Sequence, residues 1–186
     1  MGLHDRPYWK DSDQTGGGSG GMSLGMPKPT RMVKYLLIIN LAAFLAQVFL
    51  EVTLKFRLST IFGATVGGFW QLWRYVTFQF LHDPRSLWHI GLNLLGLYMF
   101  GTPLEGRWGS RRFLTFYLTC GAVAGVAYVV MGGVLALPHG IPLIGASGGV
   151  YGILLACAVL FPNFRVILVL FPVPIRLAAV IIFGGM

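Results

Sequence analysis

The feature that most constrains this chain is a series of long apolar runs with few charges. The first occupies residues 32–50, and three more occupy residues 87–101, 113–135 and 145–161. About 20 apolar residues allow an α-helix to cross the hydrocarbon core of a bilayer. Because backbone N–H and C=O groups must be paired inside lipid, such runs fold as helices. The pattern predicts an all-α polytopic membrane protein with four full transmembrane helices.

A last apolar stretch follows Pro162 and runs to Met186. It is interrupted by two prolines and an arginine, and no charge or interfacial anchor closes it. We therefore expect a truncated fifth helix, in a transmembrane domain over residues 32–186 that is incomplete at its carboxyl end.

Residues 1–31 mix charges with a Gly/Ser tract and cannot bury a core, which predicts a disordered tail. The short connections also differ in charge: residues 136–144 carry no Lys or Arg, whereas the other connections and the tail do. Since Lys and Arg gather on the cytoplasmic side, the tail is expected to be cytoplasmic, and residues 145–161 to begin at the outer face. A bacterial inner membrane or a plasma membrane would suit this topology.

Composition agrees with a membrane protein, because 55% of the residues are hydrophobic and 11% charged, against about 25% charged in soluble domains. The net charge of +8 comes from basic residues at the ends of apolar runs, which argues against a nucleic-acid partner. No cluster of Cys, His or carboxylates has metal-ligand spacing, and we expect no metal or cofactor. Cys120 and Cys157 lie within apolar runs and are interpreted as packing residues.

Two polar features lie outside the candidate site. Residues 52–87 combine aromatic rings with scattered charges, which predicts a loop lying partly in the headgroup layer with short helical pieces. Asn40 and Gln47 are seven residues apart in the first apolar run, so they share a helical face that is expected to point toward other helices.

One serine, Ser147, lies in the glycine-rich sequence PLIGASGGVYG at residues 142–152. In one interpretation the glycines let helices approach closely and the hydroxyl bonds to its own helix. In the other, Gly145 and Gly148 clear space around a nucleophile, so that a peptide backbone reaches the hydroxyl and the serine N–H.

His89 and Asn93 are four residues apart and project from one helical face at the outer end of the second span. Polar side chains at such a position either bond between helices or mark a functional site. The predicted topology brings them to the depth of Ser147, and together the three have the chemical content of a nucleophile with an oxyanion hole.

From about residue 33 onward the chain carries four motifs: Trp73-Arg74, His89-x-x-x-Asn93, Glu105 with Arg107 and Gly109, and Gly145-Ala146-Ser147-Gly148 with Tyr151. In their order and spacing, these motifs resemble those of rhomboid intramembrane serine proteases.

The resemblance implies a bundle of six helices that cleaves transmembrane substrates near the outer membrane face. Ser147 would be the nucleophile, and its own N–H, His89 and Asn93 would hold the oxyanion. Tyr151 would pack against the catalytic base. Trp73 and Arg74 would be structural, and Glu105 either a partner within its loop or a solvated carboxylate of the turn.

The chain departs from the family in one respect. Rhomboid proteases take their general base from a histidine of the sixth helix, and this sequence has no histidine after His139. We expect a fragment of an active protease whose sixth helix and base are absent. The alternative is a catalytically inactive protein that binds transmembrane clients. The oligomeric state is left open.

Overall fold

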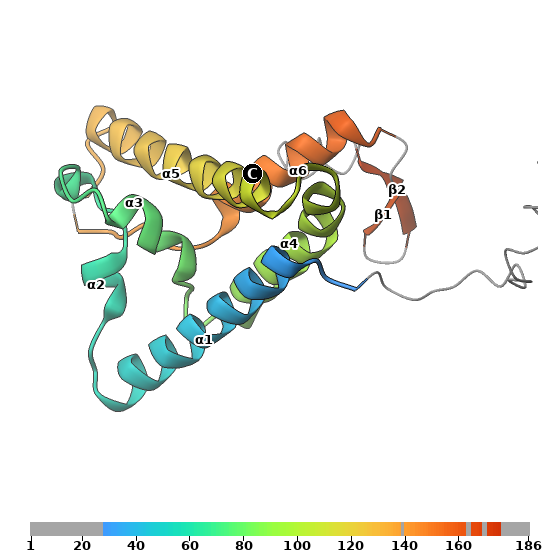
Figure 1. Cartoon of the computed structure of the whole chain (residues 1–186). Helices are drawn as coiled ribbons and strands as arrows, with labels where there is room; N and C mark the ends of the chain where they lie inside the picture. The colour runs from blue at the N-terminus through green and yellow to red at the C-terminus, as the bar shows by residue number, and fades with distance from the viewer. Residues whose placement is uncertain (1–27, 139, 163–164, 169–170, 176–186) are drawn as a thin grey trace, which may run out of the picture.

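The computed structural model describes residues 28–138, 140–162, 165–168 and 171–175 (Figure 1). Four helices longer than ten residues dominate the described chain, and short helical turns connect the first of them to the second. The long helices are α1 (Arg31–Thr53), α4 (Leu87–Trp108), α5 (Ser110–Val134) and α6 (Ser147–Leu160). The short elements are α2 (Leu58–Phe62), η3 (Val66–Gly68), α3 (Arg74–Thr77) and η4 (Phe78–Phe80).

Two of the described helices, α1 and α5, are long and apolar enough to cross a membrane. The other two predicted spans form helices but fall short of that test. Helix α4 has 22 residues, which include His89, Asn93 and Pro103. Helix α6 is apolar but has only 14 residues, about 21 Å of helix against a hydrocarbon core of about 30 Å.

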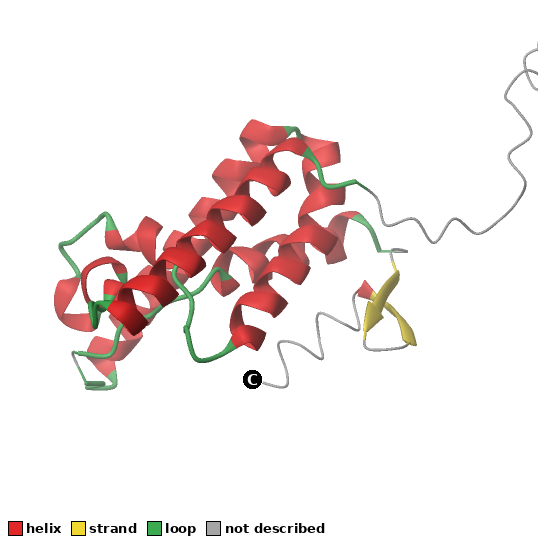
Figure 2. Cartoon of the chain, turned by 90° about the horizontal axis from the view of Figure 1, so that it is seen from below, coloured by secondary structure: helices red, strands yellow, loops and turns green. Residues whose placement is uncertain are grey.

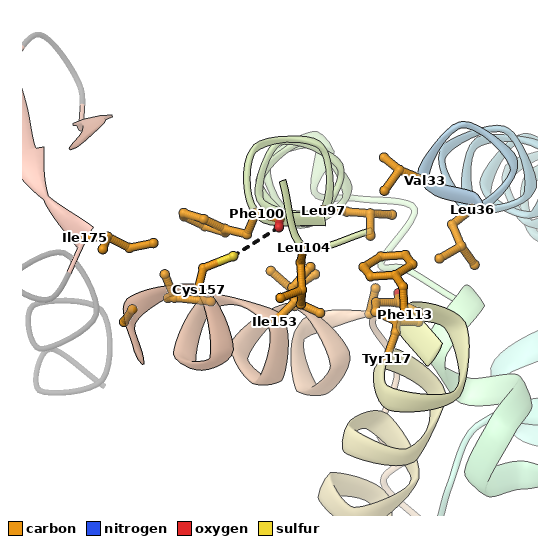
Figure 3. Close-up of a cluster of buried hydrophobic side chains, with 14 residues drawn as sticks. Val33, Leu36, Leu97, Phe100, Leu104, Phe113, Tyr117, Ile153, Cys157 and Ile175 are labelled. Atoms are coloured by element: carbon orange, nitrogen blue, oxygen red, sulfur yellow. Dashed lines mark hydrogen bonds between the residues drawn. The ribbon is translucent and has the colours of Figure 1, made fainter. Parts of the chain in front are cut away.

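The hydrophobic core lies where α4 crosses α1, α5 and α6 (Figure 3). Leu97 and Leu104 of α4 are nearly inaccessible, as are Phe113 of α5 and Ile153 of α6. The Cys157 thiol of α6 also donates a hydrogen bond to the Phe100 carbonyl of α4, 3.1 Å away. Cys120 and Cys157 are both free thiols, and Cys157 packs in the core as the sequence predicted.

Glycines bring α6 close to its neighbours. A Cβ added at Gly148 would lie 2.6 Å from the Ala124 Cβ of α5, and one at Gly152 would lie 2.5 Å from the Cys120 sulfur. On α4, a Cβ at Gly96 would lie 2.7 Å from a Val150 methyl of α6. The close-packing interpretation of the glycine-rich segment therefore holds for Gly148 and Gly152.

The predicted aromatic loop contains the expected short helical pieces. Phe69, Trp70 and Trp73 are at least half exposed, while the Arg74 guanidinium turns inward and donates to the Gly63 carbonyl at 2.5 Å and the Thr60 carbonyl at 2.8 Å. Arg74 thus ties α3 to α2 and to Gly63, the residue after it, while a structural role for Trp73 stays a prediction.

The expected fifth helix is wrong for the residues described after Pro162. Strand β1 (Arg165–Leu168) pairs antiparallel with β2 (Phe171–Pro174), in a register that sets Arg165 opposite Pro174. Figure 2 shows this hairpin in yellow beyond the end of α6. Prolines at 172 and 174 disfavour a helix interior, and the β-branched residues around them favour strands. Residues 176–186 lie outside the described part of the chain.

Helix α4 also extends further than predicted, so that Glu105 belongs to a helix and not to a turn. The residue is 4% exposed, and its carboxylate accepts hydrogen bonds from the Met32 N–H at 2.9 Å and the Val33 N–H at 2.9 Å. The Thr30 hydroxyl and the Ser110 hydroxyl also donate to it. Glu105 therefore caps the amino end of α1 from another helix. The interpretation as a solvated carboxylate is wrong, and a partner within the same connection is present in Ser110.

Candidate active site at the amino end of α6

Ser147 is the first residue of α6, and Ala146 is its N-cap. The first intrahelical bond of this end runs from the Val150 N–H to the Ala146 carbonyl, at 3.0 Å. The N–H groups of the first turn, including that of Ser147, have no intrahelical acceptor and lie at the positive end of the helix dipole. Within the described residues no partner is recorded for the Ser147 hydroxyl, which is half-buried. The geometry favours a negatively charged oxygen beside this serine.

Gly145, in the loop that leads to Ser147, lies against His89. Its backbone φ of 124° is one that residues with a side chain rarely adopt, and a Cβ added there would lie 2.6 Å from His89 Nε2. The Gly145 N–H donates to the Phe78 carbonyl at 3.0 Å, which fixes the loop. Gly145 is therefore the glycine that clears space at the site, while Gly148 serves helix packing.

His89 is held by the amino end of α4. Ser86 is the N-cap of that helix, and its hydroxyl accepts the His89 N–H. The imidazole Nδ1 accepts the Asp83 N–H at 3.3 Å. A neutral imidazole that accepts at Nδ1 carries its proton on Nε2. The ring thus presents an N–H donor toward Gly145, two residues before Ser147.

Asn93 lies one turn further along α4 and is buried. Its amide nitrogen donates to the His89 carbonyl at 2.7 Å. A carboxamide has two N–H donors, so one remains for another acceptor. His89 and Asn93 are therefore coupled on one helical face, as their spacing predicted.

A pocket of about 350 Å³ opens between α5 and α6 beside the serine. Ser147 and Tyr151 both line it, since they are one turn apart on α6. The opposite wall is mainly Ala124, Ala127, Tyr128 and Met131 of α5. Such a mainly apolar pocket can accept an apolar group next to the Ser147 hydroxyl.

His82 lies behind His89 and is fully buried. The two rings meet edge to face, with centroids 5.2 Å apart. Burial lowers the pKa of His82 to about 4, with nearby His89 as a smaller cause. His82 is therefore neutral at pH 7. Among the described residues, no group of three His, Cys, Asp or Glu side chains could hold a metal ion.

The pKa of His82 predicts acid sensitivity of the fold. The unfolded chain binds a proton near pH 6.5, whereas the folded chain binds it only near pH 4. Stability is therefore complete above the unfolded pKa and falls as pH decreases through this window. We expect the thermal unfolding temperature in detergent to fall from about pH 7 to about pH 5, and to fall less in His82→Gln. An equal fall in both proteins would contradict this assignment.

The backbone before Ser147 is held by the aromatic loop. Ala64 and Leu143 form an antiparallel bridge, in which the Ala64 N–H donates at 3.1 Å and the Leu143 N–H at 2.7 Å. The Arg74 guanidinium donates to the carbonyl of Gly63, the residue before Ala64. Non-helical backbone at membrane depth must be paired within the protein, and this bridge provides the pairing.

Replacing Arg74 with lysine is expected to loosen this bridge. An ammonium group cannot reproduce the two-pronged contact of a guanidinium with two carbonyls. Hydrogen exchange at Ala64 and Leu143 should become about tenfold faster, as expected when one charge-assisted hydrogen bond is lost. Arg85→Lys, at an exposed position, is the control and should leave both amides unchanged. Unchanged exchange in Arg74→Lys would show that Arg74 does not support the bridge.

The remaining sequence-predicted residues, Trp73 and Glu105, do not line the pocket beside Ser147. Glu105 is 16 residues after His89 on α4, which corresponds to about 24 Å of helix. Trp73 is half exposed beside the inward-facing Arg74. The sequence did not reveal two backbone groups that hold the site: the Asp83 N–H, which binds His89, and the Phe78 carbonyl, which binds the Gly145 N–H. A backbone group can come from any residue type, so no sequence pattern marks it.

In a comparison with protein families, the Rhomboid domain matches residues 69–186 of this chain. That match covers more than half of the chain, and the chain belongs to the rhomboid family of membrane proteins.

Individual relatives agree with this assignment. The chain is 35% identical to "Rhomboid protein 1, mitochondrial" of Saccharomyces cerevisiae over 129 residues, which cover 59% of this chain and 37% of the relative. It is 37% identical to "Rhomboid protease GlpG" of Serratia proteamaculans over 87 residues, covering 47% and 28%. It is also 37% identical to "Rhomboid protease GluP" of Bacillus subtilis over 82 residues, covering 44% and 14%. The chain thus spans little more than a third, or less, of these relatives.

Proposed function

We propose that this chain carries the nucleophile and oxyanion site of an intramembrane serine endopeptidase. The observation that carries the proposal is the hydrogen bond from the Asp83 N–H to His89 Nδ1, at 3.3 Å, from which we infer that the imidazole carries its proton on Nε2. Its Nδ1 accepts the Asp83 N–H, so its Nε2–H is directed at Gly145, beside the amino end of α6. Two of the relatives are named proteases.

In the proposed reaction, the Ser147 hydroxyl attacks a peptide carbonyl and forms a tetrahedral intermediate. The negative oxygen is stabilised by the Ser147 N–H, the His89 Nε2–H and the free N–H of the Asn93 amide. The intermediate then collapses, and the amine leaves with the proton that the general base took from Ser147. Water then hydrolyses the acyl-enzyme, giving up its own proton to the same base. Donors of this kind act strongly in a site from which bulk water is excluded.

A general base must take the Ser147 proton. Neither described histidine suits this role. His89 accepts at Nδ1 and donates at Nε2, and the pKa of His82 is about 4, far below neutral pH. His139 lies outside the described residues. The proposal therefore assigns no base to the described chain, and the family resemblance places the base on a later helix.

The proposed substrates are transmembrane proteins, whose helices must unwind locally to present a carbonyl. With the tail of residues 1–31 in the cytoplasm, the amino end of α6 faces the outer side, and cleavage falls near that face. The names of the relatives include a mitochondrial protein and bacterial proteases. We propose a bacterial inner membrane or a plasma membrane as the location of this chain.

Replacing Ser147 with alanine tests the function. The proposal requires a general base from outside the described residues, so the test uses the protein in its native membrane. The protein should release fragments of a co-expressed transmembrane reporter, and Ser147→Ala should release none while keeping its helical circular dichroism. Ser110→Ala is the matched control, because that hydroxyl binds Glu105 far from the site. A fluorophosphonate probe should label the parent protein and not Ser147→Ala.

The outcomes distinguish the two functional classes. Loss of cleavage in Ser147→Ala alone supports the protease. Reporter capture that is equally strong in the parent and in Ser147→Ala, with no cleavage in either, would favour the client-binding alternative.

A further inference from the structure

Gln47 is a buried polar residue in the carboxyl-terminal half of an apolar helix. It lies on α1 and is 0% exposed. Its Oε1 accepts the His82 N–H at 3.0 Å, and its Nε2 donates to Glu51 Oε1 at 3.2 Å. An unpaired amide is costly in an apolar interior, so these two bonds fix its orientation. The sequence indicated only that Gln47 faces other helices.

The loop held by Gln47 is the loop that holds His89. Two consecutive N–H groups point to different partners: that of His82 binds Gln47, and that of Asp83 binds His89 Nδ1. The buried His82 ring also packs edge to face on the His89 ring. Displacing His82 would therefore displace the Asp83 N–H from the imidazole.

We propose that Gln47 is a positioning residue, which acts through the His82–Asp83 backbone to keep His89 as its Nε2–H tautomer, with the proton directed at Gly145. This role deepens the proposed function and rests on it, because the tautomer matters for catalysis only if His89 donates to an oxyanion. If the Asp83 N–H moved away from Nδ1, the Nδ1–H tautomer of His89 would no longer be disfavoured. In that tautomer the imidazole N–H would point away from Gly145.

The experiment measures the tautomer directly. The full chain in detergent micelles is labelled with ¹⁵N-histidine, and the His89 ring signals are assigned from their loss in His89→Gln. In the parent chain we expect Nε2 protonated and Nδ1 unprotonated. In Gln47→Met the ratio of Nε2–H to Nδ1–H forms should fall about fivefold, the ratio that one ordinary hydrogen bond sustains.

Asn40→Leu is the matched control. Asn40 lies on α1, is also 0% exposed and donates to the Leu36 carbonyl of its own helix at 2.8 Å. This variant should lower thermal stability without changing the His89 tautomer. Gln47→Asn, whose shorter side chain cannot reach His82, replaces Gln47→Met if the latter does not fold.

A second readout uses cleavage of the reporter. A positioning role predicts a lower kcat with little change in KM for Gln47→Met, because the donor is needed in the transition state. An unchanged tautomer in both Gln47 variants, or an equal shift in Asn40→Leu, would overturn the proposal. The nuclear magnetic resonance result stands without cleavage, so failure of the proposed function and failure of this inference are separable.

Discussion

Gly145→Ala is expected to lower kcat for reporter cleavage in the native membrane at least about a hundredfold. Two independent effects combine. The backbone at this position has a φ of 124°, and the new Cβ would lie 2.6 Å from His89 Nε2. The methyl group must displace either the imidazole or the backbone that leads to Ser147, and both belong to the oxyanion site. The measurement is the initial rate of reporter cleavage.

Gly140→Ala is the control for this result, since Gly140 lies in the same loop and a Cβ there meets nothing within 4 Å. It should cleave at the parent rate. If Gly145→Ala also cleaved at the parent rate, the contact between Gly145 and His89 would have no part in the mechanism.

Glu105→Ala is expected to cause the largest loss of stability, about 2–4 kcal/mol. The substitution removes a carboxylate that receives the Met32 and Val33 N–H groups and two hydroxyls. These N–H groups lie at the amino end of α1, where the helix dipole also favours a negative charge. Thermal unfolding in detergent, followed by circular dichroism, measures the effect.

Two variants bracket this prediction. Ser110→Ala removes one of the donors and should cost about 1 kcal/mol. Arg107→Ala, at an exposed position on the same last turns of α4, should change little. Equal effects of Glu105→Ala and Arg107→Ala would mean that the carboxylate does not hold α1.

The sequence predicted the helices well where hydrophobicity alone decides the structure. The run at residues 32–50 became α1, and the run at residues 113–135 became α5, because lipid-length apolar segments have few other solutions. The stretch after Pro162 misled the prediction for the same reason. Hydrophobicity suggested a helix, whereas its proline spacing suits the hairpin of β1 and β2.

The site was predicted in part. Helical spacing correctly placed His89 beside Asn93, and Ser147 beside Tyr151, because those pairs lie within single helices. Contacts between distant segments could not be derived in this way. Glu105 binds residues 72 and 73 positions earlier, and Gln47 binds a backbone N–H 35 positions later. Periodicity carries no information about such partners.

The bridge between Ala64 and Leu143 has a consequence for the order in which the protein is made. The two residues are 143 − 64 = 79 positions apart, so their pairing closes a long loop and must wait until α4 and α5 have been synthesised. During synthesis, therefore, Ser147 should meet His89 only after most of the bundle is in the membrane. A nascent chain that stalled before that step would expose no working nucleophile to the membrane proteins around it.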